Sequence, residues 1–162
     1  MNIPIKYLPN RLSKKDKKKQ ANQLKKSRNA YRRGIYIERK HVDSYKSKKS
    51  QHILNAEKIY NIKNLAINKE LIKKTGCTKK ALNKILKKGM GAYYSSGSRP
   101  NQTPHSWGIA RLASSLTSGK AAAIDYNILH EGCINKSKAL KLAKKARLKY
   151  GYGQRATRKV KI

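Results

Sequence analysis

Residues 103–130, TPHSWGIARLASSLTSGKAAAIDYNILH, decide the fold, because helical periodicity is clear there. Thr103 and Pro104 form a typical N-cap and first-turn pair. The helix they begin should end near Gly119 and bury one face: Ile109, Leu112, Ala113 and Leu116. A second helix over KAAAIDYNILH should follow a Ser118 cap and bury Ala121, Ile124, Ile128 and Leu129 before Gly132. We therefore expect a mainly α-helical domain.

The charge of the chain indicates its partner. It carries 41 Lys and Arg against 7 Asp and Glu over 162 residues, a formal net charge of +34. Residues 89–135 are nearly neutral, and this neutral segment is where a packed core is expected. Almost all of the excess lies outside it, which predicts a polyanionic partner, most simply nucleic acid.

Three regions are predicted from composition. Residues 1–49 form a basic N-terminal arm and helix, residues 50–150 a helical core domain, and residues 151–162 a mobile basic tail. The tail is either an ordinary disordered terminus or a segment whose Tyr150, Tyr152 and Arg155 stack on unpaired bases. Within the core domain we expect a helix-turn-helix-like pair at 68–88, a Gly/Ser-rich loop at 89–102, and helices over 103–150, the last from about Lys136 to Tyr150.

The N-terminal region combines an apolar arm with a basic helix. Residues 1–12 should be extended, with Ile3, Ile5 and Leu8 available for docking. Ser13 and Asp16 resemble a capping box that begins a helix reaching about Tyr31. Lysine repulsion makes this helix marginal alone, so it is either a phosphate-binding helix or a solvated or disordered basic arm, and ordering on binding is compatible with both.

The region 50–88 contains the helix-turn-helix-like pair. Ser50 is a plausible cap for a first helix, Asn68 caps a helix that stops at Gly76, and Thr78 caps one that stops at Gly89. The pair is either a DNA-binding motif or a helical hairpin with a solvated lysine face. Only Asn83 on the outward face of its second helix has base-reading chemistry, which argues against sequence specificity.

The neutral segment contains polar residues without an enzymatic pattern. Its loop 89–102 is either structural or an anion nest beside Arg99, and Asp125 should pair with Arg99 or Arg111. No spacing of His105, His130, the serines or the cysteines marks a catalytic or metal site, so we expect no enzyme and no cofactor. Cys77 and Cys133 are expected to be reduced, partly buried thiols. Without a long apolar run, we expect a soluble protein, in the cell or inside a particle, with no membrane partner.

The stretch KKTGCTKKALNKILKKGMGAYYSSGSRPNQTPHSWGIARLASSLTSGKAAAIDYNIL resembles a domain of unknown function encoded by large nucleocytoplasmic DNA viruses, including algal and giant viruses, and by some phages. GAYYSSGSRPNQT and SWGIARLAS are its distinctive parts, and RLSKKDKKKQ and KSRNAYRRG are similar to the basic leader of members. The resemblance implies a virus-encoded protein located in the virion, and in the host cytoplasm or nucleus during infection. It brings no activity or catalytic residue.

We expect a non-enzymatic, mostly sequence-independent protein that neutralises packaged DNA, with DNA favoured over RNA. The alternative is a minor capsid or scaffold protein whose basic arm binds other virion subunits; a helix-turn-helix regulator or a nucleic-acid enzyme are further alternatives. The expected nucleic-acid contacts are Lys14, Lys15, Lys17, Lys18, Lys19, Lys25, Lys26, Arg28, Arg32, Arg33, Lys79, Lys80, Asn83, Lys84, Lys87, Lys88, Arg99, Lys144, Lys145, Arg155 and Arg158.

Overall fold

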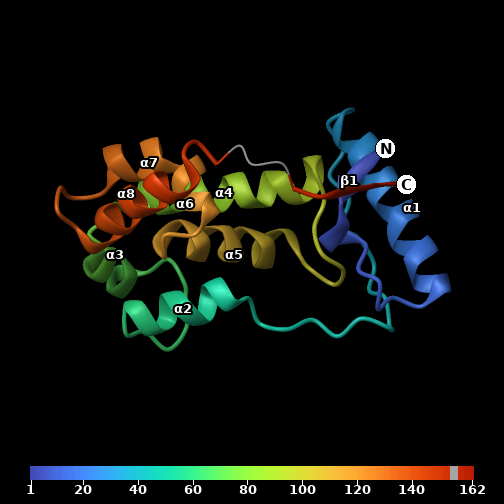
Figure 1. Cartoon of the computed structure of the whole chain (residues 1–162), viewed down its shortest axis with the longest axis horizontal. Coiled ribbons are helices and arrows are strands. Elements are labelled where there is room, and N and C mark those ends of the chain that lie inside the picture. The colour runs from blue at the N-terminus through green and yellow to red at the C-terminus, as the bar shows by residue number, and fades with distance from the viewer. Residues whose placement is uncertain (154–156) are drawn as a thin grey trace. The chain divides into compact units, whose positions relative to one another are not determined.

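A computed structural model describes residues 1–153 and 157–162 of the chain. The fold is mainly α-helical, as predicted. Its elements in chain order are β1 (Asn2–Pro4), the 3-10 helix η1 (Ile5–Tyr7), α1 (Lys14–Tyr31), α2 (Gln51–Ile59), α3 (Lys69–Thr75), α4 (Lys79–Ser95), α5 (Pro104–Leu116), α6 (Lys120–Ile124), α7 (Tyr126–Gly132), α8 (Lys138–Tyr150) and β2 (Lys159–Lys161) (Figure 1).

The chain forms two compact units, each assembled from segments remote in sequence. Among the described residues, unit 1 contains 1–48, 90–107 and 157–162, and unit 2 contains 49–89 and 108–153. The three regions predicted from composition, with boundaries after residues 49 and 150, remain a prediction.

Local capping signals explain where several helices begin. The Ser13 hydroxyl accepts a hydrogen bond from Asp16 N at 3.2 Å, and α1 follows it to Tyr31, as the sequence predicted. Thr103 and Ser106 cap α5 reciprocally, each hydroxyl accepting from the other residue's backbone N–H. The Asn68 carboxamide likewise accepts from Leu71 N at 2.9 Å at the start of α3.

The core of unit 1 is built on the N-terminal segment. Ile3, Tyr7, Leu8 and Leu12 are buried there against Leu24 of α1. The apolar side chains of residues 1–12 thus dock on their own unit, where burial stabilises the fold. Only Asn2–Pro4 forms a strand, and the expected extended arm is interrupted by the 3-10 helix Ile5–Tyr7.

The prediction of a mobile tail is also wrong for residues 159–161, which form strand β2. Lys159–Lys161 pairs antiparallel with Asn2–Pro4, with Ile3 opposite Val160, so the two ends of the chain lie together (Figure 1). The N-terminal amine donates to the Ile162 carbonyl at 3.0 Å. A strand as short as β2 has no recognisable pattern in the sequence, because it is stable only when its backbone groups pair with those of β1.

Unit 2 holds the larger core. It is formed mainly by apolar residues of α3 to α8, with Leu82, Ile85, Leu112, Leu116 and Leu129 fully buried. Of the second-helix residues expected inside, Leu129 is fully buried but Ile124 is 44% exposed, which corrects that prediction.

Three predictions about helix boundaries are wrong. Helix α4 does not stop at Gly89 but continues to Ser95, so the loop predicted at 89–102 begins only after the helix. A Cβ on Gly89 would lie 2.6 Å from the Gly108 Cα, which shows that this glycine permits close backbone packing of α4 on α5 rather than ending a helix. The helix predicted over 120–130 is broken at Asp125, and its N-cap is Gly119 rather than Ser118.

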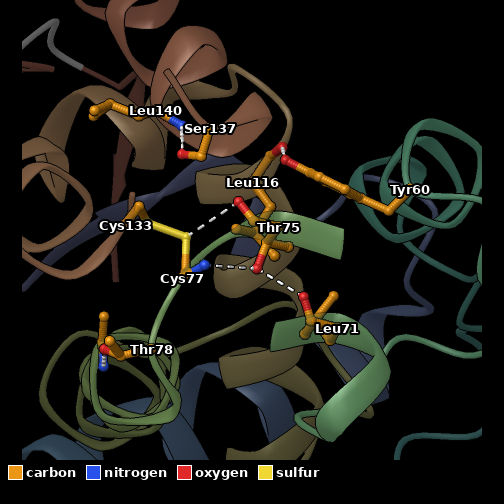
Figure 2. The surroundings of a disulfide bond; sticks show 10 residues. Tyr60, Leu71, Thr75, Cys77, Thr78, Leu116, Cys133, Ser137 and Leu140 are labelled. Carbon is orange, nitrogen blue, oxygen red and sulfur yellow. Dashed lines mark hydrogen bonds between the residues drawn. A yellow bond between two sulfur atoms is a disulfide. The ribbon is translucent and has the colours of Figure 1, made fainter. Parts of the chain in front are cut away.

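A disulfide joins Cys77 to Cys133 in unit 2, contrary to the expected reduced thiols (Figure 2). The two residues form an antiparallel bridge, flanked by hydrogen bonds from Thr78 N to Gly132 O and from Ile134 N to Gly76 O, both 2.8 Å. The residues are 56 positions apart, so only the tertiary fold brings them together.

Candidate nucleic-acid interface

Helix α1 has a buried polar face. Asp16, Gln20 and Ser27 are buried although they are polar, and each has a partner. The Gln20 amide donates to the Tyr7 carbonyl at 3.1 Å, and an Asp16 carboxylate oxygen accepts from Ser44 N at 2.8 Å. Hydrogen bonds from the side chain and the backbone of Ser44 hold the pKa of Asp16 below its ordinary value. The helix is therefore anchored in unit 1 without an apolar stripe.

The opposite face of α1 is cationic and exposed. Residues spaced at i, i+4, i+8, i+11 and i+15 share one side of a helix, and here they are Lys14, Lys18, Asn22, Lys25 and Asn29, all exposed. At 1.5 Å per residue, the three lysines span roughly 16 Å along the helix. The other predicted contacts exposed on α1 or just after it are Lys15, Lys17, Lys19, Lys26, Arg32 and Arg33.

Two of the predicted contacts in this region also bond to the main chain. Lys19 Nζ donates to the His41 carbonyl at 2.8 Å, and a guanidinium nitrogen of Arg28 donates to the Asn2 carbonyl at 3.2 Å. Arg28 is half-buried. Both side chains thus contribute to holding unit 1 together.

The irregular segment 39–45 is held by side chains instead of a partner strand. Gln23 of α1 bonds to both the N–H and the carbonyl of Lys40, and Asn101 bonds to both those of Val42, at 2.8 and 2.9 Å. Asn101 also donates to the Tyr45 carbonyl. These bonds satisfy backbone groups that would otherwise need a sheet.

Arg39 anchors this segment with neutral partners. Its guanidinium donates to the Ser27 hydroxyl at 2.9 Å, the Tyr93 carbonyl at 3.0 Å and the Ser98 hydroxyl at 2.8 Å. It also lies 3.8 Å from the centroid of the Tyr93 ring. Burial lowers the pKa of Arg39 from its ordinary value, while the nearby tyrosines oppose that shift.

A cavity of about 210 Å³ lies between α1 and this segment. Its lining is cationic apart from one acid and two neutral residues, and consists of Lys19, Gln23, Lys26, Ile37, Glu38, Arg39 and Lys40. Because Lys19, Gln23 and Arg39 already bond to the protein, the cavity belongs to the anchoring of segment 39–45.

Arg99 lies in the loop that follows α4 in unit 1, and its side chain is exposed. The neighbouring Ser98 hydroxyl donates to the Arg99 carbonyl at 2.8 Å and accepts from Arg39. Gly97, at φ 110°, lies close to Leu24 and Tyr7, where a Cβ would collide. The polar groups of the loop are thus engaged within unit 1, which favours the structural interpretation over an anion nest.

In unit 2, the predicted helix-turn-helix-like pair exists as two helices. Gly76 ends α3 in the left-handed conformation, and the Thr78 hydroxyl accepts from Ala81 N at the start of α4. On α4 the lysines of the predicted face are exposed: Lys79, Lys80, Lys84, Lys87 and Lys88. Asn83 is half-buried, and its expected role in reading a base edge remains a prediction.

The buried carboxylate of Asp125 forms ion pairs with two basic side chains, Arg111 and Lys88. Arg111 donates to it through Nε at 2.9 Å and Nη2 at 2.8 Å, and Lys88 Nζ donates at 2.7 Å. Burial alone would raise the pKa of Asp125, but the hydrogen bonds from Arg111 and Lys88 outweigh it and hold the pKa below its ordinary value. The predicted pairing with Arg111 is confirmed, and the second cation is Lys88 rather than Arg99.

The remaining predicted contacts lie towards the C-terminus. Lys144 and Lys145 are exposed on α8, and Arg158 is exposed just before β2. Arg155 lies outside the described residues. Both units therefore carry predicted contacts.

The sequence suggested Tyr152 as a stacking residue, but it did not predict the row of flat side chains that Tyr152 joins in unit 2. The Tyr126 and His130 rings stack with centroids 5.8 Å apart. The Arg147 guanidinium carbon lies 4.7 Å from the centroid of Tyr126 and 4.4 Å from that of Tyr152. The spacing of Tyr126 and His130 at i, i+4 on a helix was the available signal, but Arg147 joins them only through tertiary packing.

These features define a small, mainly α-helical, strongly basic protein. The chain belongs to DUF5824, a family of unknown function whose model matches residues 4–130. No curated protein and no solved structure matches it. Within residues 1–153 and 157–162, no helix combines the length and apolar character of a membrane span, and no cluster of three or more metal-ligating side chains occurs.

Proposed function

We propose that this protein is a non-enzymatic, virus-encoded virion protein that binds nucleic acid, DNA in preference to RNA, and neutralises it with little regard to sequence. The observation that carries the proposal is the exposed cationic face of α1, which unit 1 anchors from the opposite side. A preformed row of cations binds phosphates without first ordering a flexible arm.

The charge balance supports the same function. Even if every one of the 7 acidic side chains neutralised one cation, most of the 41 Lys and Arg would remain without an internal counter-charge. Phosphates are the commonest dense source of negative charge for such a surface. On the exposed basic faces of the helices, lysines outnumber residues able to read base edges. Contacts to the sugar-phosphate backbone of the nucleic acid should therefore dominate.

The disulfide supports a location in the virion. Disulfides persist in oxidising environments, including virion surfaces, and are rare in the reducing cytosol. Cys77 and Cys133 are both buried, which protects the bond from exchange.

The capsid alternative has less support from the described contacts. Its apolar docking residues were to be Ile3, Ile5 and Leu8, but Ile3 and Leu8 are buried within unit 1. An acidic protein surface remains the partner that would replace nucleic acid if the test below fails.

The test is equilibrium binding of the purified, nucleic-acid-free protein to short duplexes of unrelated sequence across a salt series. We expect equal affinity for all duplexes and a steep decrease with salt, since the logarithm of affinity falls by about 0.9 per phosphate contact for each tenfold rise in salt. One strongly preferred duplex would indicate a regulator instead, and weak binding at low salt would favour capsid contacts.

A charge-matched pair of variants tests the α1 face itself. Changing Lys14, Lys18 and Lys25 together to Gln should lower the slope of the salt dependence by about three. The control changes three other exposed lysines, Lys46, Lys48 and Lys63, to Gln. If both triple variants bind alike, the net charge and not the α1 face is responsible.

A further inference from the structure

The stacked row of Tyr152, Arg147, Tyr126 and His130 ends in an open aromatic ring. Tyr152 is 72% exposed although its ring lies 4.4 Å from the Arg147 guanidinium carbon. One face of the ring therefore has a cationic partner, while most of the side chain is accessible to solvent.

The position of Tyr152 is fixed by the chain on either side of it. Gly151 ends α8 at φ 58°, and Gly153 follows at φ 76°. Gly153 N donates to the Tyr150 carbonyl at 3.0 Å, and a Cβ on Gly153 would lie 2.4 Å from Ile124 Cγ1. The two glycines thus turn the chain tightly and hold the ring over Arg147, so that binding would require little further ordering.

Arg147 is held by rings. Its Nε atom is buried without a hydrogen-bond partner, and the guanidinium lies between Tyr126 and Tyr152. A guanidinium in this position attracts the π-face on each side and leaves the outer ring of the row for a further flat group.

The surface beside the row is cationic and exposed. Lys144 lies one turn before Leu148 on α8, and Leu148 is 90% exposed. Lys144 also lies three residues before Arg147, on the same side of the helix. An exposed ring with a lysine nearby has the two components of a single-strand site, stacking for the base and positive charge for the phosphates.

We propose that Tyr152 and the row behind it bind an unpaired base of single-stranded nucleic acid, with Lys144 near the adjoining phosphate. This inference rests on the proposed nucleic-acid binding and adds a preference that charge alone cannot produce. In a duplex the bases stack on one another, so the ring of Tyr152 has no base face to meet. The site therefore discriminates unpaired from paired strands.

The test compares three probes on the full chain: an oligothymidylate, an abasic strand of the same length, and a duplex of the same length. Tyr152→Ala should weaken oligothymidylate binding by about 5- to 100-fold and leave the abasic strand and the duplex unchanged. Tyr152→Phe keeps the ring and should bind like the wild type. Leu148→Ala is the matched control for loss of an exposed apolar side chain next to the row.

The outcomes separate this inference from the proposed function. An unchanged affinity of Tyr152→Ala for oligothymidylate, or an equal loss on the abasic strand, overturns the stacking site even if duplex binding persists. Absence of duplex binding in the wild type contradicts the proposed neutralising role, whereas the comparison of oligothymidylate with the abasic strand still decides whether a base is stacked.

Discussion

Reduction of the Cys77–Cys133 bond should lower the free energy of unfolding by about 4 kcal/mol. The bond closes a loop with a sequence separation of 56. The chain-entropy relation for a loop of that size gives roughly 14 cal/mol/K, which at room temperature is about 4 kcal/mol removed from the unfolded state. For a chain of this length such a change corresponds to a Tm lower by about 8 to 16 °C.

The assay is denaturant unfolding of the oxidised and the reduced wild-type protein, followed by far-UV circular dichroism. Comparing the same sequence in two redox states changes no side-chain volume, which a cysteine substitution would do. Trp107 fluorescence, recorded in the same titration, reports on unit 1, since Trp107 packs against Tyr7 there. Intact mass after thiol alkylation confirms the redox state of each sample.

Two results would refute this reasoning. Alkylation of both cysteines in the native, unreduced protein would show that the bond is not formed. Identical unfolding midpoints for the oxidised and reduced forms would show that the unfolded chain gains no freedom when the loop opens.

The remaining predictions concern single positions. Gly89→Ala should destabilise the protein, because its Cβ would lie 2.6 Å from the Gly108 Cα, whereas Gly91→Ala in the same helix meets nothing within 4 Å and should stabilise it by about 0.5 to 1 kcal/mol; opposite shifts of Tm check the pair. Asp125→Asn should cost about 3 to 5 kcal/mol at neutral pH, measured by denaturant unfolding, while the exposed Glu131→Gln should have little effect. The pKa of Asp125 is depressed in the folded state, so its contribution to the free energy of unfolding is present above the unfolded pKa near 4 and is lost as the pH falls through the lower folded value. The difference in stability between wild type and Asp125→Asn should therefore close in acid. A difference independent of pH would contradict the assignment. Asn101→Ala should lower the Tm of unit 1, followed by Trp107 fluorescence, because three backbone groups of residues 42 and 45 lose their partner; an unchanged Tm would show that water replaces it.

The features predicted correctly from the sequence depend on neighbours in the chain. Ser13, Asn68 and Thr103 cap helices through N–H groups only three residues away, so the residue types suffice to locate those starts. The buried face of α5 likewise follows from spacing alone.

The features that were missed depend on residues far apart. Glycine ends a helix or lets two backbones approach, and nothing near Gly89 distinguishes these roles until Gly108 is placed against it. The pairing of β1 with β2 joins the two ends of the chain, and Cys77 meets Cys133 across most of a unit. The predicted contacts were chosen by residue type, which explains why Lys19, Arg28 and Lys88 were not recognised as partly structural.

The pairing of β1 with β2 has a consequence for the order in which the protein forms during synthesis. All described segments of unit 2 have been made by residue 153, whereas unit 1 needs residues 159–161 to complete its sheet. Domains generally fold as units while the chain emerges from the ribosome. Translation of unit 2 begins after that of unit 1, but unit 2 is the first that can finish folding. Until residues 159–161 have been synthesised, the strand Asn2–Pro4 has an unpaired edge.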